Sequence, residues 1–296
     1  MVGSFTPSVL LDLARGTGRL SEQHLDVTEQ PVVSSPAQFR TLLDGVLDVA
    51  LTSPDNVLAY RFDPENPLGA VADVRIVAAV DRGMGLGLYG RPGSLASDLV
   101  GARAGVDVPT SGFALALYAL AERLGVAREQ FELVALGSTP RRLEALLVGD
   151  CDATMLNAGN ELVAEAAGCV RLAGVAELLA PYLGTVVAVA GTERLDVARR
   201  LSRALLDTAA AVLDGSLDGP AAESAARRLD LDDHLALRYV DRLRDPVDGL
   251  VPDGYVDRGA LETLVRLRTT YLPRVVDGRE VLAAALEDDS GLVQPA

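Results

Sequence analysis

Residues 106–120 read VDVPTSGFALALYAL, and the short polar turn inside this stretch decides how the chain is interpreted. An apolar strand is expected before Pro109, and the nearly continuous apolar run after Gly112 predicts a buried helix. Thr110 and Ser111 stand between the two. Hydroxyl side chains cap a helix because their oxygen accepts a hydrogen bond from a free amide of the first turn. They also suit a binding site, because the same amides attract anionic groups.

Three other strand-to-helix corners have the same character, at residues 4–8, 52–56 and 157–160. Each follows a predicted strand and opens a helix with Ser, Thr, Asp or Asn in a capping position. In parallel α/β sheets these corners lie at the carboxyl ends of the strands, where ligands bind. Capping alone explains any single corner. The recurrence in two separate parts of the chain favours a shared cleft.

Strands and helices alternate from residue 2 to about residue 90 and again from residue 94 to residue 174, which is typical of parallel sheets covered by helices. The segments GMGLGLYGRPG (83–93) and APYLGTVVAVAG (180–191) are the two places where the chain would pass between units. We therefore predict an α/β protein of two lobes with parallel-rich sheets, joined by a two-strand hinge and followed by a helical C-terminal tail. Residues 1–91 would begin lobe 1, residues 92–185 would form lobe 2, and residues 186–296 would return to complete lobe 1.

Composition excludes several classes of function. The net charge of −15 argues against a nucleic-acid partner, which requires clustered basic residues. The chain contains no lysine, which rules out Schiff-base chemistry and a P-loop. Its two cysteines and two histidines form no metal-binding pattern, so we expect neither a metal nor another cofactor.

The sequence has no apolar run long enough to span a membrane. It also shows no signal peptide, which predicts a cytoplasmic protein as the sequence stands. If an export signal has been removed, an extracytoplasmic location is expected instead.

Several segments resemble the solute-binding proteins of ABC importers. They include FTPSVLLDLA (5–14), LDVALTSPDNVLAYR (47–61), GVDVPTSGFALALYALAERLG (105–125) and LGSTPRRLEALLVGDCDATMLN (136–157). The resemblance covers residues 3–275 and is nearest to the nitrate, sulfonate, taurine and thiamine-precursor type. It implies a type II periplasmic-binding fold that binds a small polar or anionic organic solute by hinge closure. For an exported chain it also implies an ABC permease as partner, and it leaves the oligomeric state open.

Carried over to this sequence, the resemblance implies ligand contacts at the corners of both lobes. A further contact is expected from Arg82 near the hinge, since a guanidinium can bind an anion through two hydrogen bonds, although an ion pair with a neighbouring acid such as Asp81 is an equal alternative. Phe5 and Phe113 would either stack on a planar ligand or pack in the core. The predicted ligand-binding residues are Ser4, Phe5, Thr6, Thr52, Ser53, Asn56, Arg82, Thr110, Ser111, Gly112, Phe113 and Asn157.

Two alternatives remain open from the sequence. The same fold hosts cytosolic enzymes, so a lyase-type decarboxylase or dehydratase, or an enzyme of cofactor-precursor biosynthesis, would act on a small carboxylated substrate. A general base would then have to be Asp55, Asp81 or Asp107, with Asp55 the first candidate, because neither histidine lies near a corner. The other alternative is a ligand-sensing module that works with a separate partner.

Overall fold

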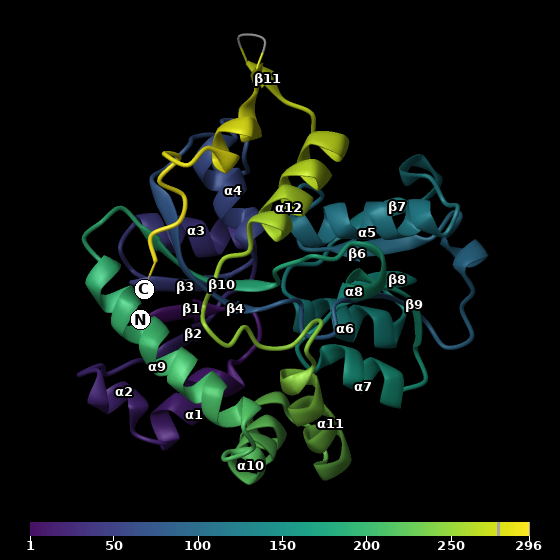
Figure 1. The fold of residues 1–296 in the computed structure, drawn as a ribbon. Coiled ribbons are helices and arrows are strands. Elements are labelled where there is room, and N and C mark those ends of the chain that lie inside the picture. The colour runs from purple at the N-terminus through teal and green to yellow at the C-terminus, as the bar shows by residue number, and fades with distance from the viewer. Residues whose placement is uncertain (277–278, 296) are drawn as a thin grey trace.

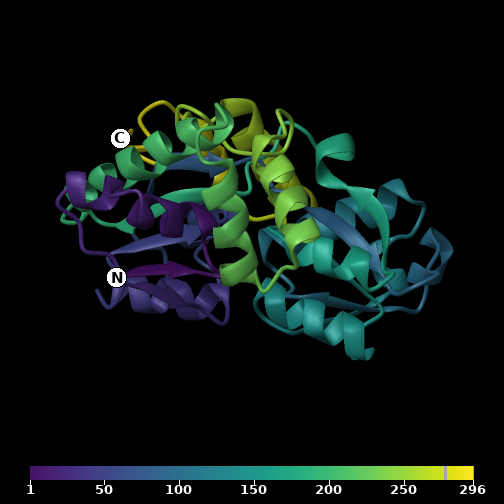
Figure 2. The same ribbon diagram turned by 90° about the horizontal axis from the view of Figure 1, so that it is seen from below.

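The computed structural model describes residues 1–276 and 279–295 (Figure 1). Two five-stranded sheets form the centres of two lobes, and helices cover the faces of both sheets. The predicted two-lobed α/β architecture is confirmed. In Figure 2 the lobes lie side by side, with C-terminal helices across their junction.

The first sheet has the strand order β2-β1-β3-β10-β4. Strands β1 (Val2–Ser4), β2 (Glu29–Pro31) and β3 (Val49–Thr52) are parallel, whereas β10 (Thr185–Ala190) runs antiparallel between β3 and β4 (Val74–Asp81). The central strands are apolar and buried on both faces, as expected for a sheet covered by helices. The carboxyl ends of β1 and β3 therefore meet at one edge of this sheet.

The second sheet has the strand order β7-β6-β8-β5-β9. Strands β6 (Arg103–Val106), β7 (Glu132–Ala135) and β8 (Ala153–Leu156) are parallel, and β5 (Gly87–Gly90) pairs antiparallel with β8 and with β9 (Val170–Gly174). The chain thus passes between sheets within residues 82–86 and again within residues 179–184. The first passage lies ahead of residue 91, so strand β5 belongs to the sheet of the second lobe.

Helices fill the connections between strands. In the first lobe these are α1 (Val9–Gly16), α2 (Arg19–Glu22), α3 (Ser35–Leu43) and α4 (Pro54–Phe62). In the second lobe they are α5 (Gly112–Arg123), α6 (Thr139–Val148), α7 (Asn160–Ala166), α8 (Val175–Leu178) and the short 3-10 turns η1 (Ala96–Leu99) and η2 (Arg128–Gln130).

The C-terminal part contains α9 (Leu195–Leu213), α10 (Asp218–Leu229), α11 (Asp233–Arg244) and α12 (Arg258–Tyr271). Helices α9 and α10 pack on α1 and extend the core of the first lobe. Helix α11 contacts α7 of the second lobe, and α12 contacts α5 (Figure 1). The predicted helical tail therefore also bridges the two lobes.

Beyond α12 lie the short strands β11 (Val275–Val276) and β12 (Arg279–Glu280) and the 3-10 helix η3 (Val281–Leu286). The last residues run beside β4, where the Leu292 carbonyl accepts from the Ile76 amide and the Gln294 amide donates to the Ile76 carbonyl. The end of the chain thereby adds a short extended segment to the free edge of the first sheet.

Candidate functional site

A cavity of about 140 Å³ lies between the two sheets. Its walls contain residues from all four corners that the sequence singled out, two from each lobe. The corners converge because the first-lobe pair follows β1 and β3 and the second-lobe pair follows β6 and β8, at the carboxyl ends of parallel strands. The arrangement leaves a small enclosed space between the two lobes.

The capping and binding interpretations of these corners are compatible. Ser8, Ser53 and Ser111 each accept a hydrogen bond from an amide in the first turn of the helix that they cap, and all three line the cavity. A hydroxyl oxygen has two acceptor positions and one hydrogen. Capping uses an acceptor position and leaves the hydrogen free to donate to a ligand.

The same reasoning extends along the cavity wall. Thr6, Thr52 and Thr139 accept side-chain hydrogen bonds from Asn160, Asn56 and Arg142 respectively. Within the described residues none of these hydroxyls donates to a protein acceptor, so the lining is rich in available donors. The six hydroxyls of this kind are those of Thr6, Ser8, Thr52, Ser53, Ser111 and Thr139.

Ser4 also lines the cavity but differs from these six hydroxyls. It donates to Glu29 Oε1 at 2.6 Å, and the same carboxylate oxygen accepts the Ser8 amide at 2.8 Å. Arg228 of α10 binds the other carboxylate oxygen, Glu29 Oε2. Glu29 therefore occupies the amino terminus of α1 and fixes the loop that carries Phe5 and Thr6.

Arg142 in α6 is a functional candidate that the corner argument missed. Its side chain is 2% exposed and lines the cavity from the second lobe. The hydrogen bonds of its guanidinium within the described residues go to uncharged oxygens, namely the Gly137 and Met155 carbonyls and the Thr139 hydroxyl. Burial lowers the pKa of Arg142 to about 10, which leaves it protonated at neutral pH.

A sequence signal for Arg142 exists in the helical spacing of α6. Arg142 lies three and four residues before Ala145 and Leu146, which are both buried, whereas the adjacent Arg141 is exposed. Residues with this spacing share one face of a helix. The periodicity therefore indicates which of two neighbouring arginines points inward, although it does not place that face beside the cavity.

An ion pair between α12 and α4 holds the second-lobe corner at residues 109–112. Arg268 of α12 binds both carboxylate oxygens of Asp55 at 2.8 Å, and its Nη2 also donates to the Thr110 carbonyl at 2.8 Å. Arg268 and Asp55 are almost completely buried. Gly112 packs directly on Asp55, because a Cβ placed on this glycine would lie 2.5 Å from the Asp55 Cβ.

A second contact between the lobes is formed by Asp107 and Ser35. Asp107 Oδ2 accepts hydrogen bonds from the Ser35 amide at 3.1 Å and from its hydroxyl at 2.7 Å, so a carboxylate from the second lobe caps α3 of the first. Asp107 Oδ1 is buried and has no partner within the described residues. The Ser138 amide also reaches across to the Val33 carbonyl. The two lobes are therefore in direct contact beside the cavity.

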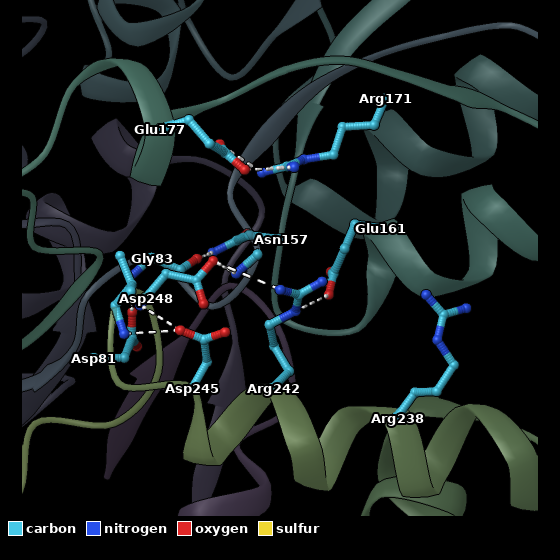
Figure 3. A network of polar contacts seen from close by, with 12 residues as sticks. Asp81, Gly83, Asn157, Glu161, Arg171, Glu177, Arg238, Arg242, Asp245 and Asp248 are labelled. Carbon is cyan, nitrogen blue, oxygen red and sulfur yellow. Dashed lines mark hydrogen bonds and ion pairs between the residues drawn. The ribbon is translucent and has the colours of Figure 1, made fainter.

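Polar groups surround the hinge beside the cavity (Figure 3). Asp81, at the end of β4, lines the cavity and accepts from the Gly83 amide at 2.9 Å. Burial raises the pKa of Asp81 to about 6, against the lowering effect of its hydrogen bonds. Asn157, directly after β8, donates to the Gly83 carbonyl and so joins the second lobe to the same turn.

Arg242 of α11 lies between two buried carboxyl groups in this network (Figure 3). Its Nε is 3.9 Å from Glu161 Oε1 and its Nη1 is 3.8 Å from Asp248 Oδ2, both beyond hydrogen-bond distance. Burial raises the pKa of Glu161 to about 7 and raises that of Asp248 as well. One guanidinium therefore faces two carboxyl groups whose pKa values are raised.

Ten of the twelve predicted ligand-binding residues line the cavity. They are Ser4, Phe5, Thr6, Thr52, Ser53, Asn56, Ser111, Gly112, Phe113 and Asn157. Thr110 and Arg82 do not. Thr110 offers its carbonyl to Arg268 in the contact between lobes described above.

Arg82 points away from the cavity. Arg82 follows directly after β4 ends at Asp81, and unlike Asp81 it does not line the cavity. Its Nη1 donates to the Leu250 carbonyl at 2.8 Å, and it lines a separate outer hollow that includes Tyr182 and Asp253. The alternative ion pair with Asp81 is not formed either, because within the described residues that carboxylate accepts from Gly83 instead.

Asp55 is not placed to act as a general base. Both of its carboxylate oxygens are bound by Arg268, and it is absent from the described residues that line the cavity. Asp81 and Asp107 do line it. Across residues 1–276 and 279–295, no group of three His, Cys, Asp or Glu side chains is arranged to hold a metal ion. No helix in this part of the chain is long and apolar enough to cross a bilayer.

No protein-family model and no curated protein matches this sequence. Solved structures do match its fold. The alkanesulfonate-binding protein SsuA from Xanthomonas axonopodis pv. citri, bound to MOPS, is 17% identical with a TM-score of 0.72 and covers 100% of this chain and 97% of its own.

Two other matches are of similar quality. The ligand-binding component of an ABC-type import system from Staphylococcus aureus, with zinc bound, is 14% identical with a TM-score of 0.70 and covers 91% of this chain and 90% of its own. A Candida albicans protein described as having the generic periplasmic binding protein fold is 16% identical with a TM-score of 0.71, over 99% and 95% of the chains. The chain therefore has the two-lobed fold of the periplasmic binding proteins.

Proposed function

We propose that this protein binds a small polar or anionic organic solute in the cavity between its lobes, and that the lobes close around it. The observation that carries the proposal is the composition of the wall, in which hydroxyl donors from both lobes surround a space of about 140 Å³. Donors without protein acceptors favour a ligand with several acceptor oxygens. Two of the similar structures, an alkanesulfonate-binding protein and the ligand-binding component of an ABC-type import system, support the same class of function.

Closure would link the two halves of the site. We propose that the lobes rotate about the connecting segments 82–86 and 179–184, with each lobe moving as a unit. The solute stabilises the closed state by the difference between its affinities for the closed and open states. The contacts of Arg268 with Thr110 and of Asp107 with Ser35 would form and break in this motion.

For a form of the chain outside the cytoplasm, we propose an ABC permease as the partner that receives the solute. The support is that a similar structure is the ligand-binding component of an ABC-type import system. Co-purification with candidate permeases, in the presence and absence of solute, tests this part separately.

The central test is a search for the solute itself. Native mass spectrometry of gently purified protein should show a bound small molecule, and adding that molecule back should raise the melting temperature. The added molecule should be recovered unchanged after prolonged incubation. Conversion of the molecule to a product would replace binding with catalysis, and failure to find any stabilising solute in a broad library would refute the proposal.

A further inference from the structure

The polar network at the hinge contains two buried carboxyl groups, Glu161 and Asp248 (Figure 3). Their side chains are more than nine-tenths buried, and neither residue is among the described residues that line the cavity. One oxygen of each group accepts a backbone amide, that of Gly159 at 2.8 Å for Glu161 and that of Gly85 at 3.1 Å for Asp248. The other two oxygens, Glu161 Oε1 and Asp248 Oδ1, have no hydrogen-bond partner within the described residues.

Arg242 does not satisfy these two oxygens. Its nitrogens lie 3.9 Å from Glu161 Oε1 and 3.8 Å from Asp248 Oδ2, so it attracts both groups without a hydrogen bond to either. A buried carboxylate that lacks a bonded counter-charge is costly, and such a group takes up a proton instead. The geometry around Glu161 therefore favours the neutral carboxylic acid.

The other charged and titratable groups around Glu161 leave Arg242 as the cation that faces it within the described residues. Arg238 binds Glu165, and Arg171 binds Glu177 through two hydrogen bonds. The groups around the network are Glu165 on α7, Arg238, Tyr239 and Arg242 on α11, Asp245 and Asp248 after α11, Tyr89 on β5, Arg171 on β9, Glu177 on α8 and Asp81 on β4.

The network joins parts of the chain that belong to different lobes. Glu161 lies on α7 of the second lobe, whereas Arg242 lies on α11, which packs on α9 and α10 of the first lobe. Asp248 is also tied to the first lobe, because the Val251 amide just after it donates to the Val80 carbonyl of β4. The surroundings of Glu161 therefore depend on how the two lobes sit against each other.

We propose that Glu161 is a proton-binding site coupled to closure, so that its carboxyl group takes up one proton when the lobes close and releases it to water when they open. The proposal rests on the proposed function, since it assigns the proton as a second ligand of the same motion. A ligand that binds one of two states more tightly shifts the population toward that state. Closure should therefore be favoured at low pH and weakened as the pH rises.

The size of the effect follows from the raised pKa of Glu161. With a pKa of about 7 in the closed state and the ordinary 4.5 when water reaches it, this support for closure is complete below pH 4.5 and is lost as the pH rises through 7. Between pH 6 and pH 8 the ratio of closed to open molecules should fall about tenfold. Asp81, with a pKa of about 6, adds at most about twofold over the same interval.

The distance between the lobes of the solute-free protein tests this without a known solute. Spin labels are placed on cysteines introduced at the exposed positions Val46 in the first lobe and Val148 in the second. Double electron–electron resonance at pH 6, 7 and 8 then gives the distance distribution. The wild-type distribution should move to longer distances as the pH rises, and a distribution that does not change with pH would overturn the proposal.

Two variants assign the effect to Glu161. Glu161→Gln carries a neutral side chain at every pH, so it should keep the wild-type pH 6 distribution at pH 8 and reduce the change in the closed-to-open ratio to within about twofold. Arg242→Met removes the cation that lowers the Glu161 pKa, so the fall in the ratio should move to higher pH by about one unit. An unaltered pH dependence in both variants would refute the role of Glu161.

Glu165→Gln is the matched control on the same helix. The Glu165 carboxylate is bound directly, by Arg238 at 2.5 Å and by the Tyr89 hydroxyl at 3.0 Å. Its replacement should weaken the contact between α7 and α11 equally at every pH and keep the tenfold change. A structural defect would likewise open the lobes at all pH values, so the pH dependence separates a proton site from a packing defect.

The outcome is separable from the proposed function. If a solute from the library search binds but the distance between the lobes does not respond to pH, the proton site fails and the binding function stands. If the distance responds neither to pH nor to any library member, and none binds, both proposals fail. If Glu161 changes the pH profile of unfolding but not the distance, the proton is bound on folding alone and the coupling to closure is refuted. Arg242→Met keeps the test decisive if Glu161→Gln does not fold.

Discussion

Replacing Gly112 by alanine should prevent the two lobes from closing fully. The added Cβ would lie 2.5 Å from the Asp55 Cβ, 2.7 Å from its Cγ and 2.8 Å from its Oδ2. Carbon atoms in ordinary contact are about 3.5–4.0 Å apart, so the surfaces must separate by about 1 Å. Asp55 cannot turn aside, because Arg268 binds both of its oxygens.

The expected magnitude follows from this forced separation. Overpacking of a tight contact costs about 1–3 kcal/mol, which corresponds to a change of roughly 5- to 150-fold in the ratio of closed to open molecules. The local helix should not suffer, since alanine is better than glycine in a helix by about 0.5–1 kcal/mol. The variant should therefore fold normally and be biased toward the open state.

Distance measurements between spin labels would detect the change. Labels on cysteines introduced at Val46 in the first lobe and Val148 in the second suit this purpose, because both positions are exposed. The native cysteines, Cys151 and Cys169, are buried and should label poorly. Gly112→Ala should broaden the distance distribution and move it to longer values.

A matched control is Gly16→Ala at the end of α1, where an added Cβ would meet no atom within 4 Å. This variant should give the wild-type distribution. If Gly112→Ala does the same, and its solute affinity is within twofold of the wild type, the contact between Gly112 and Asp55 does not govern closure.

Three further predictions concern buried polar contacts. Arg268→Met leaves the Asp55 carboxylate buried and unpaired, so urea denaturation should show that the free energy of unfolding falls by about 3–5 kcal/mol. A decrease below about 1 kcal/mol would contradict the importance of this ion pair for stability. Glu161 has a folded-state pKa of about 7 against an ordinary 4.5, so its contribution to the free energy of unfolding is fully present below pH 4.5 and is lost as the pH rises to 7. Over that range the free energy of unfolding of Glu161→Gln should rise by about 3 kcal/mol relative to that of the wild type. Parallel pH profiles of the two unfolding free energies would refute this. Ser35→Ala removes the hydroxyl that binds Asp107 and should lower solute affinity or stability by about 1 kcal/mol, with Ser34→Ala as a helix-capping control that does not touch Asp107.

Much of the fold could be predicted from local sequence patterns. Apolar strands followed by Ser-, Thr- or Asn-containing corners mark the carboxyl ends of β1, β3, β6 and β8, and the glycine-rich segment at 83–93 contains the first passage between lobes. These features depend on a few neighbouring residues, and the residue types that cap helices identify them in the sequence. The same patterns, together with the resemblance to solute-binding proteins, predicted ten residues of the cavity wall.

The parts that were missed depend on contacts between distant segments. Arg82 was assigned to the ligand because of its charge, but its guanidinium donates to the Leu250 carbonyl, 168 residues later in the chain. Asp55 looked available as a base until folding brought Arg268 to it from 213 residues away. Arg142 lay inside a quoted segment, yet only the packing of α6 against β8 places its side chain at the cavity.

The position of β10 in the first sheet has a consequence for how the chain is made. All five strands of the second sheet lie within residues 87–174, whereas the first sheet has residues 185–190 inserted between β3 and β4. During synthesis from the amino terminus, the second lobe has all of its strands before the first lobe has β10, which lies between β3 and β4. The lobe that begins the sequence should thus finish folding later, and a ribosome-bound chain ending shortly before residue 185 should protect the second lobe from proteolysis while the first remains open to it.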